Sequence, residues 1–515
     1  MLKKAWPILI PAALVIFYLV IHLLRLTSLP VFADEAIYIR WAQLIMDDAR
    51  RYAFFPMNDG KTPLYIWLLV PFQFLFSDQL YAARIVSVLV GLAQLFVIKA
   101  LVKTLGGRPK GQYLAMLLTT ILPFWYLYHR MALMDGFLTF WISLCVLFTI
   151  QLSLQKKPSW KYVPLIGISL GLAFWTKLPA LFLIPALPFL LLIPPRKQYK
   201  EYLPSLYFLM CGVLLGGVIF VSLRLSPSFC QLFRRGQDFT YPPAEVLFQG
   251  KWRETLANIP SYINYFVRYL TPPIFFLSLI AVFSNRYRRR AVILILAAFL
   301  FSFPFVLFGK VIYARYLFPS ALFLTITAVL SLQALYDHWF VEKPLMDWQK
   351  TAVGIVIALL VANALASSAI FINAAIFNPD QMPLVPSDRF QYLEDWSSGH
   401  GIAQTVQFIQ NQAKTKKIAV ATEGRFGTLP DGLLLYFHHR DVTNIYIEGT
   451  GEYPVKTIPD FFKAKAKNFD QTILVVNSNR MEIVLPPANL LGQFCRPNKA
   501  PCLQVWDITQ LIQKK

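Results

Sequence analysis

The sequence predicts a membrane all-α polytopic bundle of about eleven transmembrane helices, followed by a C-terminal extracytoplasmic α/β domain. The first reason is composition. Of 515 residues, 57% are hydrophobic and only 15% are charged, against roughly 25% charged residues in an average soluble protein. The second reason is that the hydrophobic residues fall in blocks of about 17 to 25, the length that crosses a bilayer core of about 30 Å. Helices that are hydrophobic on all sides need a lipid environment.

Length and hydrophobicity identify the predicted spans. They are roughly Ala5–Leu26, Gln79–Lys103, Gln112–Leu127, Gly136–Leu154, Tyr162–Thr176, Ala180–Pro194, Tyr202–Leu225, Pro272–Ser284, Ala291–Gly309, Tyr316–Leu335 and Thr351–Phe371. The first span is too long for a signal peptide and lacks a cleavage site of small residues, so we expect it to be retained. The segment Pro63–Phe76 is short and broken by proline, which is typical of a surface or re-entrant segment.

Basic residues determine the predicted orientation. They gather in short stretches between or before the spans, at Lys3–Lys4, Lys103–Lys110, Lys156–Lys161, Arg196–Lys200, Arg286–Arg290 and Lys343–Lys350. By the positive-inside rule these stretches are cytoplasmic, so the loops Thr27–Asp78, Tyr128–Asp135 and Ser226–Thr271 and the C-terminal tail lie outside. Because such loops supply most of the net charge of +22, we expect a multi-pass protein of the cell membrane and no binding to nucleic acid.

The composition changes near residue 373, which divides the chain into a membrane domain, residues 1–372, and a soluble domain, residues 373–515. The second part has short β-rich runs at Lys417–Thr422, Val442–Glu448, Thr472–Asn477 and Leu503–Ile508. Helix-like stretches separate these runs, and this alternation predicts a small α/β domain with a mostly parallel sheet. Cys495 and Cys502 lie in this tail, and if the tail is outside the cytoplasm a disulfide between them is plausible.

Acidic residues near the outer ends of spans are candidates for catalysis. Asp34 and Glu35 follow the first span closely, and Asp135 precedes the fourth. A carboxylate beside a partly desolvated site can act as a general base. The alternative for Asp34 is a helix N-cap, with Glu35 in the acidic first turn.

Basic residues from separate segments reach the same outer face, and these are candidates for substrate binding: Lys61, Arg84, Arg130, Lys177 and Arg315. Each alone can be explained by snorkelling to the interface. Together they suit an anionic lipid head group such as a phosphate. We therefore expect these cations and the carboxylates to meet in one pocket. The spacing of the histidines fits no metal motif, although a divalent metal stays an open alternative.

Six short motifs occur in a characteristic order between Met1 and Leu335. They are Phe32-Ala-Asp-Glu35, Lys61-Thr-Pro-Leu-Tyr65, Ala83-Arg-Ile-Val-Ser87, Arg130-Met-Ala-Leu-Met-Asp135, Gly171-Leu-Ala-Phe-Trp-Thr-Lys-Leu-Pro179 and Tyr313-Ala-Arg-Tyr-Leu-Phe-Pro319. With these motifs the chain resembles a GT-C superfamily glycosyltransferase of the protein-mannosyltransferase type (glycosyltransferase family 39), near the bacterial lipid A aminoarabinose transferases. It departs from many relatives at Thr62, where they have proline.

The resemblance implies transfer of a sugar, with inversion, from a polyprenyl-phosphate donor to an acceptor hydroxyl outside the cytoplasm. Asp34 matches the base position, which Glu35 could also fill, and Asp135 matches a second acidic position that orients the acceptor or the base. Lys61 matches a lysine that holds the lipid phosphate, and Arg315 could do similar work. The tail does not identify the acceptor, which could be a lipid, a glycan or a protein. A non-enzymatic transporter of lipids or solutes is the alternative, although no internal repeat is visible.

Overall fold

The structure is a computed structural model that describes residues 2–342, 346–438 and 443–513. The chain forms two compact units. We call Met1–Leu24, Ala53–Tyr65 and Ile85–Ala374 the membrane unit, and Arg25–Tyr52, Ile66–Arg84 and Ala375–Lys515 the α/β unit. The α/β unit thus combines the C-terminal part of the chain with two segments from the region that joins the first two predicted spans. Lys343, which the sequence places in a basic loop, lies outside the described residues.

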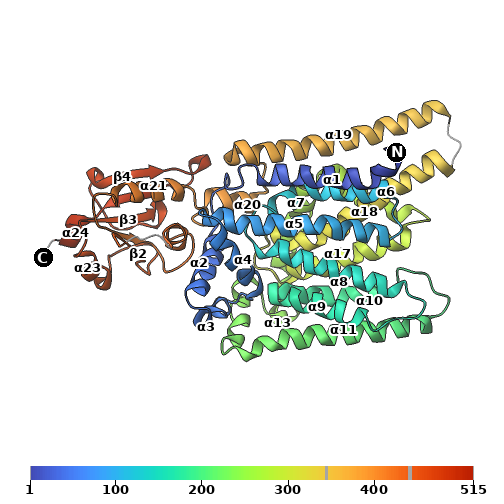
Figure 1. The fold of residues 1–515 in the computed structure, drawn as a ribbon, viewed down its shortest axis with the longest axis horizontal. Coiled ribbons are helices and arrows are strands. Elements are labelled where there is room, and N and C mark those ends of the chain that lie inside the picture. The colour runs from blue at the N-terminus through green and yellow to red at the C-terminus, as the bar shows by residue number, and fades with distance from the viewer. Residues whose placement is uncertain (1, 343–345, 439–442, 514–515) are drawn as a thin grey trace. The chain divides into compact units, whose positions relative to one another are not determined.

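The membrane unit is a bundle of helices that run alongside one another (Figure 1). Its main helices are α1 (Leu2–Leu23), α5 (Gln79–Thr104), α6 (Pro109–Ile121), α7 (Pro123–Tyr128), α8 (Met134–Ser153), α9 (Tyr162–Thr176), η2 (Leu178–Ala186), α10 (Leu187–Leu190), α11 (Leu203–Val221), α16 (Pro272–Ile280), α17 (Arg288–Phe308), α18 (Phe318–Asp337) and α19 (Asp347–Phe377). Each predicted span coincides with one of these helices or with two consecutive ones. In the described part of the chain, six helices are long and apolar enough to cross a membrane, or up to seven if a bent pair counts as one span. The number eleven stays a prediction.

Small residues bring α9 and α11 close together. Gly167 and Gly171 of α9, and Gly212 and Gly216 of α11, are spaced four apart, so each pair occupies one face of its helix. A Cβ atom added at Gly216 would lie 3.1 Å from the Leu170 side chain and 3.2 Å from the Gly167 carbonyl oxygen. Glycines at such spacing allow helix backbones to approach closely within a membrane.

A larger side chain at Gly216 is expected to destabilise the bundle. Gly216→Leu must push α9 away, and overpacking of this kind costs about 1–3 kcal/mol. Gly217→Leu is the matched control, because no atom lies within 4 Å of a Cβ added there. Thermal unfolding of the two variants in detergent should show a lower midpoint for Gly216→Leu alone. Equal midpoints would mean that this helix contact is not close.

The C-terminal part of the α/β unit contains a five-stranded sheet in the order β2-β1-β3-β5-β4. The strands are β1 (Ile418–Thr422), β2 (Ile445–Gly449), β3 (Gln471–Asn477), β4 (Leu490–Phe494) and β5 (Leu503–Asp507). The first three are parallel, and β4 and β5 are antiparallel to their neighbours. Four of these strands coincide with the predicted runs, and β4 was not predicted. Val442, at the start of one predicted run, lies outside the described residues.

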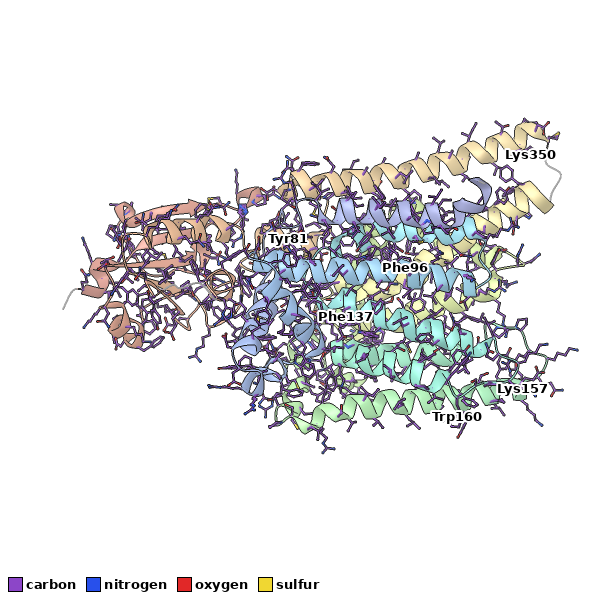
Figure 2. All side chains as sticks on the ribbon, in the orientation of Figure 1. Tyr81, Phe96, Phe137, Lys157, Trp160 and Lys350 are labelled. Atoms are coloured by element: carbon purple, nitrogen blue, oxygen red, sulfur yellow. A yellow bond between two sulfur atoms is a disulfide. The ribbon has the colours of Figure 1, made fainter. Side chains whose placement is uncertain are left out.

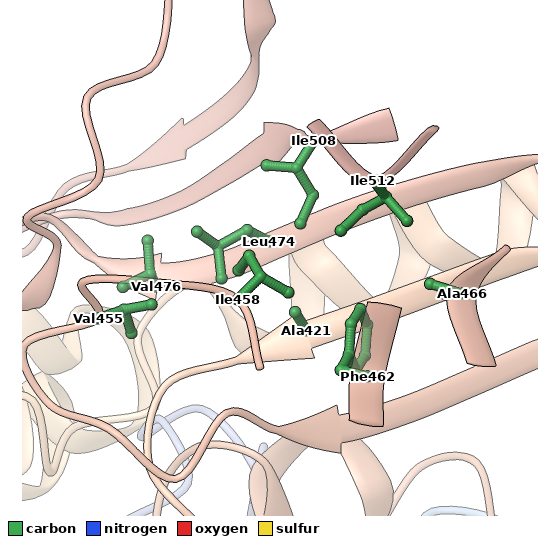
Figure 3. Packing of buried hydrophobic residues seen from close by; sticks show 10 residues of the cluster. Ala421, Val455, Ile458, Phe462, Ala466, Leu474, Val476, Ile508 and Ile512 are labelled. Carbon is green, nitrogen blue, oxygen red and sulfur yellow. The ribbon is translucent and has the colours of Figure 1, made fainter. Parts of the chain in front are cut away.

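Helices and loops cover one face of this sheet with a compact hydrophobic core (Figure 3). Side chains of residues paired across neighbouring strands point to the same face of a sheet. Ala421 of β1 is paired with Leu474 of β3, and both enter this core. Phe462 of α23 (Asp460–Ala466) and Ile512 of α24 (Thr509–Gln513) pack against them. This part also contains the α-helices α20 (Pro386–Arg389), α21 (Ile402–Gln412) and α22 (Asp431–Leu434).

A disulfide joins Cys495 and Cys502, the pair that the sequence offers for one if the tail lies outside the cytoplasm. Cys495 directly follows β4 and Cys502 directly precedes β5, so the bond closes the connection between two antiparallel strands. Cys145, Cys211 and Cys230 are free thiols.

Candidate functional site

Asp34 lies in the first turn of α2 (Ala33–Asp47), a helix of the α/β unit. The N-cap of this helix is Phe32, whose backbone is extended and whose N–H donates to Glu35 Oε2 at 3.0 Å. The alternative that Asp34 itself caps the helix is therefore wrong. Asp34 is half-buried and Glu35 is fully buried.

Glu35 forms a buried bidentate ion pair with Arg84 of α5. Arg84 Nε donates to Glu35 Oε1 at 2.9 Å, and Arg84 Nη2 donates to Oε2 at 2.7 Å. The remaining donors of Arg84 bind the carbonyl oxygens of Leu26, Leu29 and Pro30 at 2.9–3.1 Å. Both oxygens of Glu35 are thus occupied, and Arg84 fixes the loop before α2. Binding of the donor by Arg84 stays a prediction.

The far end of α2 is attached to the C-terminal part of the same unit. Gln43 Nε2 donates to the carbonyl oxygen of Leu435 at 3.0 Å. Arg40 lies near Asp431 of α22, and burial raises the pKa of Asp431 to about 7, although the Gly427 N–H and the charge of Arg40 act to lower it. Contacts at both ends of α2 therefore determine how the helix presents Asp34.

In the membrane unit, Asp135 and Lys177 form a second ion pair. Asp135 lies in the first turn of α8, and Lys177 directly follows α9. Lys177 Nζ donates to Asp135 Oδ1 at 2.7 Å. A carboxylate is favourable near a helix N-terminus and a cation is favourable near a helix C-terminus, so both helix ends support this pair.

Arg315 and Lys61 are close to this pair. The Lys177 ammonium interacts electrostatically with Asp135, with Arg315 and with Lys61. Arg315 is buried in η7 (Ala314–Leu317). Arg315 and Lys177 contact the same aromatic ring: the centre of the Tyr316 ring lies 5.6 Å from the Arg315 guanidinium carbon and 5.2 Å from Lys177 Nζ. We call Lys61, Lys177 and Arg315, together with Asp135, the cation group.

A short 3-10 helix places Lys61. This helix, η1 (Phe55–Asp59), ends at Gly60, whose φ of +71° is a left-handed conformation that glycine adopts without strain. Asp59 forms an ion pair with Arg235, and Met57 is buried in a cluster with Leu223 and Leu232. These contacts anchor the turn that precedes Lys61.

Arg130, for which substrate binding stays a prediction, contacts the end of α1. Its Nη1 donates to the carbonyl oxygens of Ile21, His22 and Leu24 at 2.8–3.1 Å. These carbonyls belong to the last turn of α1 and the residue after it, where the helix itself provides no partners. Arg130 therefore caps α1, and the sequence offered no local signal for this contact.

The cation group lies at the end of the bundle opposite to the basic loops. α8 begins beside Asp135 and ends before Lys156, and α9 begins after Lys161 and ends before Lys177. Figure 2 shows Phe137, near the start of α8, far from Lys157, which follows the end of that helix, with Lys350 at the same end of the bundle as Lys157. The antiparallel course of α8 and α9 thus brings Asp135 and Lys177 together.

Two tyrosines of the Tyr-Ala-Arg-Tyr sequence were not singled out from the sequence. The Tyr313 and Tyr316 rings both lie within 5.6 Å of the Arg315 guanidinium carbon, and Tyr316 also lies under Lys177. Such cation–π contacts hold a charge in place. The flanking of Arg315 by two aromatic residues was the available signal. In the described part of the chain, no group of three or more His, Cys, Asp or Glu residues could hold a metal ion.

Part of this site lies in a segment that is similar to a known protein family. Residues 60–221, which include Lys61, Asp135 and Lys177, match the family model for dolichyl-phosphate-mannose-protein mannosyltransferase. A search of the curated proteins finds no match.

Solved structures share the fold over most of the chain. The crystal structure of ArnT from Cupriavidus metallidurans bound to undecaprenyl phosphate has 17% identity and a TM-score of 0.57, with 99% of each chain covered. The apo structure of ArnT from the same organism has 16% identity and a TM-score of 0.58, with 100% of each chain covered. The apo oligosaccharyltransferase of Archaeoglobus fulgidus has 10% identity and a TM-score of 0.54, with 93% of this chain and 70% of that chain covered. At these identities the likeness establishes a shared fold.

Proposed function

Given that the chain has the fold of the GT-C glycosyltransferases, we propose that it is an inverting glycosyltransferase of the cell membrane. It moves a sugar from a polyprenyl-phosphate-linked donor to a hydroxyl group of a lipid, glycan or protein acceptor, at the outer face of the membrane. The observation that carries this proposal is the cation group, in which Lys61, Lys177 and Arg315 gather beside one carboxylate, Asp135.

The cation group suits the phosphate of a lipid-linked donor. Ammonium and guanidinium groups form short, strong hydrogen bonds with phosphate oxygens. Arg315 is buried and Lys177 is largely buried, so their charges act in a medium of low dielectric constant, where electrostatic stabilisation is larger than in water. The ArnT structure that shares the fold contains undecaprenyl phosphate, a lipid of this class. Asp135 keeps Lys177 in position in this proposal.

The reaction exchanges one bond at the anomeric carbon of the sugar. The acceptor hydroxyl oxygen attacks that carbon, and its proton passes to the carboxylate of Asp34. The bond between the anomeric carbon and the phosphate oxygen breaks, and its electron pair leaves with polyprenyl phosphate. The negative charge that develops on this leaving group is stabilised by Lys61 and Arg315. Glu35, whose oxygens are both bound, positions α2 and leaves the role of the base to Asp34.

Two features support the outer face as the location. Basic loops lie at the end of the bundle opposite to the cation group, and basic loops are typical of the cytoplasmic side. The disulfide between Cys495 and Cys502 lies in the α/β unit, and disulfides persist in oxidising compartments.

A transfer assay in sealed vesicles tests the proposal. The purified chain is reconstituted with undecaprenyl phosphate that carries a radiolabelled sugar, and a total envelope extract supplies acceptors. We expect label to move from the lipid donor to the acceptor fraction, with release of undecaprenyl phosphate. A donor that stays intact would contradict the proposal, and an intact donor that crosses the bilayer would identify a transporter instead.

The variant Lys61→Met tests the role of the cation group in the same assay. A hydrogen bond to a charged group contributes about 1.5–3 kcal/mol, so kcat/KM for the donor should fall roughly 10- to 100-fold. Lys103→Met, in the last turn of α5 at the other end of the bundle, is the matched control and should leave kcat/KM unchanged. Equal values for the two variants would remove Lys61 from the phosphate site.

A further inference from the structure

The parallel strands of the α/β unit meet at one edge that no step of the proposed reaction uses. β1, β2 and β3 are parallel and lie in the order β2-β1-β3, so the chain passes from β1 to one side and then crosses back to the other. In open α/β sheets, ligands bind outside the carboxyl ends of the strands at such a reversal. We call this end of the sheet, with Glu423, Tyr453, Asn477 and Arg480 at or after the strand ends and Trp396 beside Arg480, the carboxyl edge.

Polar side chains occupy the centre of the carboxyl edge. Glu423 directly follows β1 and is only 2% exposed. It accepts hydrogen bonds from the backbone N–H of Asn477 at 2.9 Å and from Asn477 Nδ2 at 2.8 Å, and Arg480 Nη1 approaches it at 3.3 Å. Burial raises the pKa of Glu423, although these hydrogen bonds and the charge of Arg480 act to lower it.

Aromatic rings surround these polar groups. The guanidinium carbon of Arg480 lies 4.1 Å from the centre of the Trp396 ring and 4.9 Å from the centre of the Tyr453 ring. Tyr453, four residues beyond β2, is 68% exposed, and Phe426, four residues beyond β1, is 55% exposed. Arg480 thus holds two rings in fixed positions while much of one ring remains open to solvent.

Backbone hydrogen bonds tie the two loops of the carboxyl edge together. The N–H of Gly424 donates to the Glu452 carbonyl at 3.0 Å, and the N–H of Gly451 donates to the Gly424 carbonyl at 2.9 Å. Gly427 has a φ of +119°, and a Cβ atom added there would lie 3.4 Å from the Trp396 ring. The loop that carries Phe426 therefore lies against Trp396, and the exposed rings belong to one surface.

At or beside this edge, buried hydrogen-bond acceptors and buried donors both include atoms that have no hydrogen-bond partner among the described residues. Among the described residues, Asn477 Oδ1 accepts no hydrogen bond, and Arg496 Nε donates none. Ser398 Oγ and Thr428 Oγ1 also lack a partner within the part of the chain that the structure describes. Arg496 interacts electrostatically with Glu423 and Arg480, so it belongs to the same neighbourhood.

The combination of charged groups, buried polar atoms and exposed aromatic rings at the carboxyl edge favours a sugar over an inorganic anion. An inorganic anion would be attracted by Arg480 but repelled by Glu423. A sugar has hydroxyl groups that both donate and accept, and its C–H faces stack on aromatic rings such as Tyr453. Binding sites of this kind combine apolar or aromatic walls with a few placed polar groups, which matches Trp396, Tyr453, Glu423 and Asn477.

We propose that the carboxyl edge, formed by Trp396, Glu423, Tyr453, Asn477 and Arg480, binds a saccharide. Under the proposed function, this saccharide is a sugar portion of the acceptor, so the identity of the saccharide rests on that function. The proposal that the carboxyl edge binds a saccharide does not depend on the proposed glycosyltransferase activity.

Direct binding tests the saccharide site. The full chain in lipid nanodiscs is applied to an array of neutral, amino, uronic-acid and phosphorylated oligosaccharides, and the best-retained glycan is titrated by calorimetry. Tyr453→Ala should weaken its Kd by about tenfold or more, because an exposed stacking surface is lost, while Tyr453→Phe keeps the ring and the affinity. Tyr199→Ala, which removes an exposed tyrosine of the membrane unit, is the control and should bind like the unmodified chain.

Three results would overturn this assignment. They are retention of no glycan beyond empty nanodiscs, equal affinity of Tyr453→Ala and the unmodified chain, and displacement of the glycan by inorganic phosphate alone. The transfer assay separates the two proposals. Transfer without glycan binding would refute the saccharide site alone, and glycan binding without release of undecaprenyl phosphate would refute the proposed function alone.

Discussion

Asp34→Asn is expected to lower turnover by about 10²- to 10⁴-fold, which is the usual contribution of a general base. Asparagine has nearly the same shape as aspartate but cannot accept the proton of the acceptor hydroxyl. Asp34 lies in the first turn of α2, and the N-cap of that helix is Phe32, so the substitution leaves the cap intact. Single-turnover assays should show the loss in the chemical step, with the Kd for the donor lipid unchanged.

Asp48→Asn is the matched control for this variant. Asp48 follows the C-terminal end of the same helix and is exposed, and its Oδ1 accepts a hydrogen bond from the Arg51 N–H, which asparagine can also accept. Its turnover should equal that of the unmodified chain. Full turnover in Asp34→Asn would remove Asp34 from the role of the base, and Asp135 would then be the remaining carboxylate to test.

Glu35→Gln is expected to destabilise the chain strongly. The change leaves Arg84 buried and charged without its carboxylate, and breaking one side of a buried ion pair costs about 3–5 kcal/mol. Hydrogen exchange along residues 26–36 should accelerate, because Arg84 also binds the carbonyls of Leu26, Leu29 and Pro30. The midpoint of thermal unfolding in detergent should fall.

Two further variants separate this structural role from a catalytic one. Glu254→Gln removes the carboxylate of an exposed pair with Lys251 and should leave the midpoint unchanged. The double variant Glu35→Leu/Arg84→Met replaces both charges by apolar groups and should recover part of the lost stability. If Glu35→Gln instead folds with a normal midpoint but has no turnover, Glu35 is a catalytic residue.

The gathering of Lys61, Lys177, Arg315 and Asp135 was predictable from the sequence in large part. Antiparallel spans with basic loops at one end bring the other ends together, and Asp135 and Lys177 stand at such ends. The fates of Arg84 and Arg130 were not predictable. Both donate to carbonyl oxygens of the last turn of α1 or of the loop after it, and the path of a loop is not encoded in a local pattern.

The strands of the sheet also differ in how well the sequence predicts them. β1 and β3 are runs of buried, mostly β-branched and small residues, which a strand prediction finds readily. β4 contains Gly492, lies at the edge of the sheet and is only partly buried, so its sequence carries a weak signal. The meeting of Asp34 with the cation group stays a prediction, because Asp34 belongs to the α/β unit and the cation group to the membrane unit.

An experimental structure of the chain with undecaprenyl phosphate bound would locate the phosphate site directly. We expect phosphate oxygens to lie within about 2.7–2.9 Å of nitrogen atoms of Lys61 and Arg315, at the end of α9 that Lys177 follows. A phosphate held at the other end of the bundle, among Lys103, Lys156 and Lys161, would contradict this expectation.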